Sequence, residues 1–70
     1  MKRSIRIAGH NTSISLEPEF WVELKRIAVV EKCSLNQLIA RVDTARSGNL
    51  SSALRVFVLR ELKSALRRAE

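Results

Sequence analysis

Residues 12–16 alternate polar and apolar side chains, in a chain whose other apolar residues recur mostly at helical spacing. Neither Gly nor Pro interrupts this period of two, which predicts a short β-strand. A single strand leaves its own backbone N–H and C=O groups unpaired, so it needs a second strand beside it. Either residues 4–7 fold back as a hairpin, or the same segment of a second copy pairs with the strand.

The predicted strand has two different faces. Ile14 and Leu16 share one face, and Ser13 and Ser15, with Asn11 in line, share the other. We therefore expect one face to be buried and the other to point outward.

Three helices are expected after the strand. Pro18 is tolerated in the first turn of a helix. Ser34 and Gln37 have the spacing of a capping box, and Asn49 can cap a third helix. The helices are expected at residues 18–31, 35–45 and 50–68.

The size of the chain favours self-association. Seventy residues form one domain, and a chain this short buries little surface by itself. One Cys makes no internal disulfide, and one Cys with one His cannot build a four-ligand metal site, so no metal or cofactor is expected. A two-fold dimer would supply both a larger core and the missing strand. The residues expected in the dimer core are Ile14, Leu16, Phe20, Trp21, Leu24, Leu38, Ile39, Val42, Leu54, Phe57 and Val58.

The charge of the chain indicates a polyanionic partner. The net charge is +6, and residues 1–11 contain no acidic residue, which suggests a basic N-terminal arm followed by one domain over residues 12–70. Aromatic residues are too few for a protein that stacks single-stranded bases, so double-stranded DNA fits better. No apolar run approaches the roughly 18 residues of a membrane span, and the capped helices disfavour a membrane-surface peptide. The N-terminus lacks the apolar core of a signal peptide, and the cytoplasm is the expected location.

The sequence resembles a bacterial subfamily of short ribbon-helix-helix proteins over roughly residues 10–62. The residues that carry the resemblance are Ile7-Ala8-Gly9-His10, Thr12-Ser13-Ile14-Ser15-Leu16-Glu17, Glu19-Phe20-Trp21, Ser34-Leu35, Asp43, Arg46 and Gly48-Asn49-Leu50-Ser51-Ser52-Ala53-Leu54-Arg55-Val56-Phe57-Val58-Leu59-Arg60. The resemblance implies an intertwined homodimer, mainly helical, with a two-stranded antiparallel ribbon formed between two chains and an extra C-terminal helix.

The resemblance also implies how DNA would be bound. The ribbon would enter the major groove, where outward side chains read base edges. In this sequence those side chains are Asn11, Ser13 and Ser15. The start of the second helix would hold a phosphate through backbone N–H groups. The residues expected to contact phosphates are Ser34, Leu35 and Asn36, together with Lys2, Arg3 and Arg6 of the basic arm.

These features favour a DNA-binding transcriptional regulator, a repressor that occupies a promoter as a homodimer and could form larger arrays on DNA. The alternative is an antitoxin or another protein-interaction module that binds a partner through the C-terminal helix, whose apolar breadth over residues 50–66 would allow it. The sequence does not indicate an enzyme, because His10 has no nucleophile partner and no Gly-rich phosphate loop is present.

Overall fold

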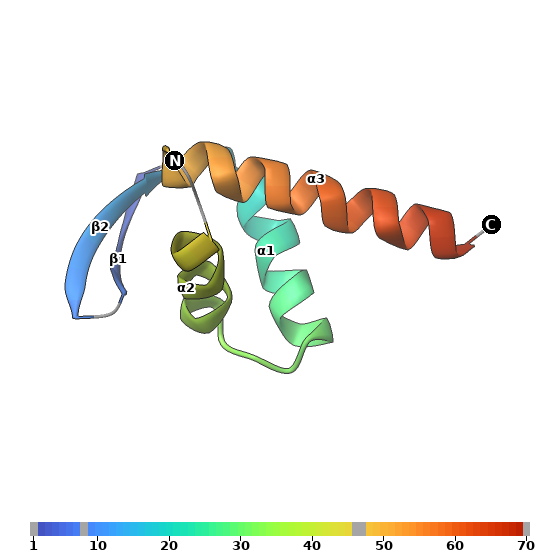
Figure 1. The fold of residues 1–70 in the computed structure, drawn as a ribbon, viewed down its shortest axis with the longest axis horizontal. Helices are drawn as coiled ribbons and strands as arrows, with labels where there is room; N and C mark the ends of the chain where they lie inside the picture. Colours follow the sequence, from blue (N-terminus) through green and yellow to red (C-terminus); the bar gives the residue numbers. More distant parts are fainter. Residues whose placement is uncertain (1, 8, 46–47, 70) are drawn as a thin grey trace.

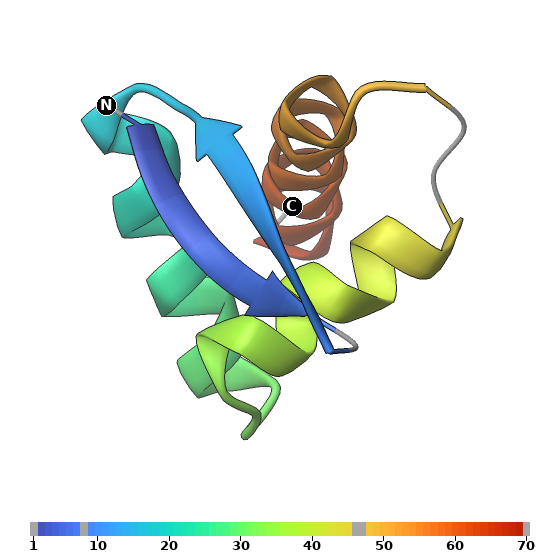
Figure 2. The ribbon, with the colours of Figure 1, turned by 90° about the vertical axis from the view of Figure 1, so that its left-hand side faces the viewer.

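The computed structural model describes residues 2–7, 9–45 and 48–69. The elements are, in order, β1 (Lys2–Ile7), β2 (His10–Ser15), α1 (Pro18–Val30), α2 (Leu35–Ala45) and α3 (Leu50–Ala69). The two strands pair as an antiparallel hairpin, and the three helices lie behind and beside it (Figures 1 and 2). The chain is mainly helical, with the two-stranded ribbon and the extra C-terminal helix that the resemblance implied. Two residues that carry part of the resemblance, Ala8 and Arg46, lie outside the described residues.

The N-terminal segment differs from the expectation. We expected a basic arm over residues 1–11, followed by one strand at residues 12–16. Instead, residues of that arm form β1, and β2 begins at His10 rather than at Thr12. Ile5 and Ile7 are buried in the core, and the burial of these two apolar side chains favours the strand over a loose arm.

The turn between the strands contains Gly9, and β2 begins directly after it at His10. Gly9 has a φ of 87°, a left-handed conformation that glycine adopts without strain. The register runs from this turn to the pair formed by Lys2 and Ser15. The second strand that β2 requires therefore comes from the same chain, so the structure shows the hairpin rather than a ribbon shared between two copies.

The core lies between the inward face of the hairpin and the three helices. Its buried members are Ile5, Ile7, Ile14, Leu16, Trp21, Leu24, Ile27, Ala28, Leu38, Ile39, Leu50, Leu54 and Val58. Eight of the eleven residues expected in a dimer core are in this set, and the other three, Phe20, Val42 and Phe57, are partly buried against it. These side chains fill the interior of one chain, because β1 and α3 supply the cover that a second copy was expected to give.

The connection between α1 and α2 ends the first helix without a glycine. Lys32 has a φ of 58°, the left-handed conformation that usually follows a helix end. The Lys32 N–H donates to the Val29 carbonyl at 3.1 Å, and the Cys33 N–H donates to the Ala28 carbonyl at 3.0 Å. These two bonds satisfy the last carbonyls of α1 and turn the chain sharply into α2.

Both later helices begin with a side-chain cap. Ser34 Oγ accepts from the Gln37 N–H at 3.1 Å, and Gln37 Oε1 accepts from the Ser34 N–H at 2.8 Å. This is the capping box that the sequence predicted. At the start of α3, Asn49 Oδ1 accepts from the Ser52 N–H at 3.1 Å, which confirms the predicted cap there.

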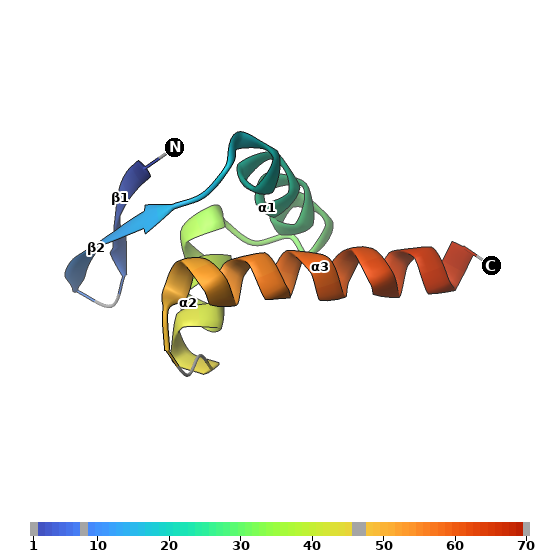
Figure 3. The same cartoon turned by 90° about the horizontal axis from the view of Figure 1, so that it is seen from above.

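The C-terminal half of α3 extends beyond the rest of the fold (Figures 1 and 3). The extents of the molecule are 41 × 22 × 22 Å, and α3 lies along the longest of them. Three leucines from the middle of α3 onward remain well exposed: Leu59, Leu62 and Leu66, at 52%, 41% and 66%.

Candidate nucleic-acid interface

The outward face of the hairpin is entirely polar or charged. Residues directly opposite each other in an antiparallel pair point to the same face, and the register therefore gathers alternate residues of β1 and β2 on one side. The outward face consists of Lys2, Ser4, Arg6, Asn11, Ser13 and Ser15, and all six are exposed. The three predicted base readers thus lie together, and β1 adds two cations beside them that β2 itself lacks.

The third basic residue of β1 belongs to the other face. Arg3 is opposite Ile14, and its guanidinium carbon lies 4.9 Å from the centre of the Trp21 ring. This is the geometry of a cation–π contact. The structure therefore separates Arg3 from Lys2 and Arg6, with which it was grouped as a phosphate contact.

The start of α2 lies beside the outer edge of β1. Asn36 Nδ2 donates to the Arg6 carbonyl at 3.4 Å. Of the three residues whose N–H groups were predicted to hold a phosphate, Ser34 already donates its N–H to Gln37 Oε1. The amides of Leu35 and Asn36 belong to the first turn of the helix, whose N–H groups have no partner within the helix.

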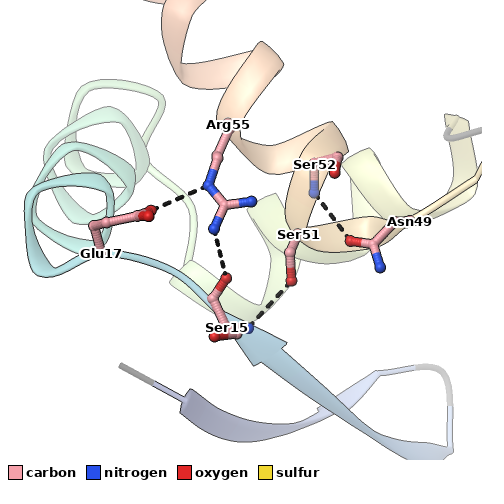
Figure 4. A network of polar contacts seen from close by, with 6 residues as sticks. All are labelled: Ser15, Glu17, Asn49, Ser51, Ser52 and Arg55. Atoms are coloured by element: carbon pink, nitrogen blue, oxygen red, sulfur yellow. Dashed lines mark hydrogen bonds and ion pairs between the residues drawn. The ribbon is translucent and has the colours of Figure 1, made fainter.

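The start of α3 lies beside the outer edge of β2, at the opposite end of the hairpin (Figure 4). Ser51 Oγ accepts from the Ser15 N–H at 3.1 Å, and Arg55 donates through Nη2 to the Ser15 carbonyl at 3.2 Å. The same guanidinium donates through Nε to Glu17 Oε1 at 3.1 Å. These hydrogen bonds join α3 to the last residues before α1.

Hydrogen bonding also shifts the pKa of the Glu17 carboxylate. Hydrogen bonding to its own backbone, and then to Arg55, lowers the pKa of Glu17 below its ordinary value of 4.5. Arg55 also lies 6.0 Å from the centre of the Phe20 ring. Sequence reasoning missed these roles of Ser51, Arg55 and Glu17, since partners 36 to 40 residues apart leave no periodic signal.

The hydrogen bonds at Ser15 and Arg6 also show which backbone groups point out of the hairpin. Alternate pairs in an antiparallel ladder exchange hydrogen bonds, and the others direct their N–H and C=O groups to the outer edges. The backbone groups of Ser15 and Arg6 bond to helices, so the Lys2–Ser15 and Arg6–Asn11 pairs direct their N–H and C=O groups to the outer edges. The Ser4–Ser13 pair lies between them and has the same orientation. Among the described residues, no partner is found for the outward backbone groups of Asn11 and Ser13.

A groove lies between α2 and α3, away from the hairpin. It has a volume of about 540 Å³ and is lined by Arg41, Val42, Ala45, Asn49, Ser52, Ala53, Val56, Phe57 and Arg60. Arg41 pairs with Glu31 at 2.7 Å, and this carboxylate raises the pKa of the guanidinium. The groove combines an apolar lining with two cationic side chains.

The described residues contain no cluster of His, Cys, Asp or Glu suited to a metal ion. Within the same parts of the chain, none of the helices combines the length and the apolar character needed to cross a membrane.

The order of the elements and the polar outward face agree with the result of a comparison with protein families. A family model described as the ribbon-helix-helix domain matches residues 1–62. The chain belongs to the ribbon-helix-helix domain family. Comparisons with curated proteins and with solved structures returned no match.

Ribbon-helix-helix domains are generally found in DNA-binding transcription regulators or antitoxins, and typically have no enzymatic activity. The match includes β1 as well as β2 and extends into α3. The ribbon of this ribbon-helix-helix chain is thus a hairpin, with the start of one helix beside each outer edge.

Proposed function

We propose that the protein is a sequence-specific DNA-binding transcription regulator that represses by occupying a promoter. The observation that carries this proposal is the outward face of the hairpin, which is exposed, polar and free of acidic residues. A two-stranded ribbon fits the major groove of B-DNA, which is about 12 Å wide. Such a protein would act in the cytoplasm of a bacterial cell, where it would reach chromosomal DNA.

The cationic and the uncharged polar residues of the outward face would have different roles in DNA binding. Lys2 and Arg6 neutralise phosphates and release counterions, which gives affinity for any sequence. Asn11, Ser13 and Ser15 donate to and accept from base edges in the groove, which gives specificity. The positive end of α2 stabilises a further phosphate beside Leu35 and Asn36.

The ribbon of this proposal is the hairpin of one chain. The family resemblance implied a ribbon shared by two chains, and the strand pattern by itself also allowed a hairpin; in the structure both strands come from one chain. Homodimers, and larger arrays on DNA, stay predictions. Promoter occupancy itself requires only that the bound protein block polymerase access.

The test is selection of sites from a pool of random duplexes, followed by binding measurements on the selected duplex and on unrelated DNA. The double variant Ser13→Ala with Ser15→Ala should lose about tenfold or more in affinity for the selected duplex, since removing a hydrogen bond to a base costs ~1 kcal/mol or more. Its affinity for unrelated DNA should stay close to that of the wild type. Ser64→Ala, an exposed serine on α3, is the matched control and should change neither affinity. Equal losses on both DNAs would show that the two serines do not read bases.

A second candidate function rests on α3. The exposed leucines Leu59, Leu62 and Leu66, together with the groove beside α2, form apolar surface that DNA binding does not use. Such a surface suits an antitoxin or another module that binds a protein partner. Replacing the three leucines by Gln should leave DNA binding intact and should abolish binding to a partner if one is held there.

A further inference from the structure

The groove between α2 and α3 has the size and the lining of a small-molecule site. Its volume is about 540 Å³, within the range of about 300–1,000 Å³ that is usual for ligand pockets. Such pockets are lined mainly by apolar side chains, with a few polar groups that orient the bound molecule. Here five of the nine lining side chains are apolar: Val42, Ala45, Ala53, Val56 and Phe57. The remaining four are Arg41, Asn49, Ser52 and Arg60.

Along α3, the polar residues of the groove lie at its two ends. The lining of this helix begins at Ser52, continues with Ala53, Val56 and Phe57, and ends at Arg60. A helix rises about 1.5 Å per residue, so about 12 Å separates Ser52 from Arg60 along the axis of α3. The groove is therefore elongated, with an apolar middle part and a cation at the end farther from the start of α3.

Arg60 is the cation with which a ligand in this groove can pair. Arg41 also lines the groove, but its guanidinium is already paired with Glu31 at 2.7 Å. By contrast, no ion pair of Arg60 is found among the described residues, and this residue is exposed. An anion that reaches this end of the groove therefore gains an arginine without breaking an existing ion pair.

We propose that the groove between α2 and α3 binds an aliphatic carboxylate, a molecule with one carboxylate group and an unbranched apolar chain. The carboxylate accepts hydrogen bonds from Arg60, whose planar guanidinium matches the two oxygens of a carboxylate. The chain lies along Phe57, Val56 and Ala53, and its burial there provides the apolar part of the binding free energy. This inference goes beyond the proposed function and does not depend on DNA binding.

The groove is a different surface from the exposed leucines of α3. Leu59 follows Phe57 by two positions, and Leu62 follows Arg60 by two positions. Two positions correspond to a rotation of about 200° around a helix, so these leucines point away from the groove. A protein partner that covers the leucines therefore need not cover the groove.

The charges favour a small anion over a second copy of the chain as the occupant. The exposed leucines of α3 are an apolar surface that a second copy could place in the groove, but Lys63 follows Leu62 and Arg67 follows Leu66. Insertion of these leucines would bring like charges toward Arg60, which costs free energy. A carboxylate brings the opposite charge to the same place. A dimer that forms through other surfaces does not compete with this ligand.

The first experiment is isothermal titration of the full chain with sodium decanoate below its micelle-forming concentration. Acetate has the carboxylate without the chain, and decyltrimethylammonium has the chain with the opposite charge. We expect one decanoate for each chain, and affinities at least about tenfold weaker for the other two probes, since each satisfies only one half of the site. Similar affinities for decanoate and decyltrimethylammonium, or binding of decanoate only as micelles, would overturn the inference. Decanoate binding that is lost as the protein self-associates at higher concentration would show that a second copy occupies the groove.

A pair of arginine variants tests the position of the carboxylate. Arg60→Gln and Arg67→Gln each remove one exposed cation from α3, but only Arg60 lines the groove. Arg60→Gln should weaken decanoate binding by about tenfold, the effect of losing a charged hydrogen bond, and Arg67→Gln should leave it unchanged. Equal losses in the two variants would mean that decanoate responds only to the overall positive charge.

A pair of valine variants tests the position of the chain. Val56 lines the groove and is 45% exposed, whereas Val22 on α1 is 62% exposed and lies outside the groove. Val56→Trp fills the groove with an indole ring and should abolish decanoate binding, and Val22→Trp should bind decanoate like the wild type. Circular dichroism checks that both variants fold, and the arginine pair decides the question if Val56→Trp does not. Full decanoate binding by a folded Val56→Trp variant would place the ligand elsewhere. Selection of duplexes by the wild type is a separate measurement, so failure of this site and failure of the proposed function are distinguishable.

Discussion

The two faces of the hairpin are built from the same two strands but differ in character. The inward face carries Ile5, Ile7 and Ile14, which are buried against the helices. The outward face consists of the six exposed polar and charged residues of the candidate interface, none of them acidic. Because side chains alternate along a strand, neighbouring residues lie on opposite faces, one of which faces the core and the other the solvent.

Residues that stabilise the fold and residues available for binding therefore lie next to each other along each strand. Burial of the inward side chains provides the favourable free energy that holds a small chain together. The outward residues contribute little to that core and are available for a ligand. Neighbouring substitutions in β2 should therefore have opposite consequences, and the following experiments test the separation from the largest expected effect to the smallest.

The largest effect is expected at Ile14, whose side chain is fully buried at 0% exposure. Ile14→Asp places an unpaired charge in the core and should destabilise the fold by roughly 3–5 kcal/mol, which a domain of this size does not tolerate. Circular dichroism should show an unfolded chain. Ser13→Asp changes the adjacent residue on the outward face, and it should keep the native spectrum while weakening DNA binding through repulsion from phosphates. A folded Ile14→Asp variant would contradict the assignment of this face to the core.

The next effect concerns the cations of the outward face. Lys2→Gln with Arg6→Gln should reduce the slope of log affinity against log salt by about 1.8, close to 0.9 for each phosphate that the variant no longer neutralises. The melting temperature should change little, because both side chains are exposed. An unchanged salt dependence would remove these two residues from the interface.

The sequence was sufficient to predict the helical body of the fold. Its caps at Ser34 and Asn49 involve partners three residues away, and such local signals are readable without tertiary structure. The period of two in β2 was also readable, and it placed Asn11, Ser13 and Ser15 together on one face. These features depend on short-range backbone geometry, which the order of residues determines directly.

The pairing partner of β2 was not determined by the sequence. Ile5 and Ile7 alternate with polar residues, but the cations around them also fitted a basic arm, and the pattern of β2 allowed two pairings. The attachment of α3 was equally hidden, since Ser51 and Arg55 meet Ser15 only after the chain has folded. Tertiary interactions of this kind follow from packing, and a single sequence carries no periodic trace of them.

A smaller effect is expected at Arg3, the one cation of β1 on the inward side. Arg3→Gln removes the cation–π interaction with Trp21 and should lower the free energy of unfolding by about 0.5–1 kcal/mol. The matched variant Arg6→Gln should change stability less and the salt dependence of DNA binding more. If the two variants behaved alike in both measurements, the division of β1 into two faces would be wrong.

The smallest effect is expected at the end of the ribbon, where Glu17 accepts from Arg55. The pKa of Glu17 is lowered in the folded chain, so its contribution to stability is complete above the ordinary value of 4.5 and is lost as the pH falls through the lowered value. The melting temperature of the wild type should therefore exceed that of Glu17→Gln at neutral pH, and the two should converge in acid well below pH 4.5. Both side chains are substantially exposed, which keeps the difference below that of Arg3→Gln. A gap that persisted in acid would mean that the ionised carboxylate is not what secures α3 to the ribbon, and Ser51 would then be the main residue that fixes the end of β2.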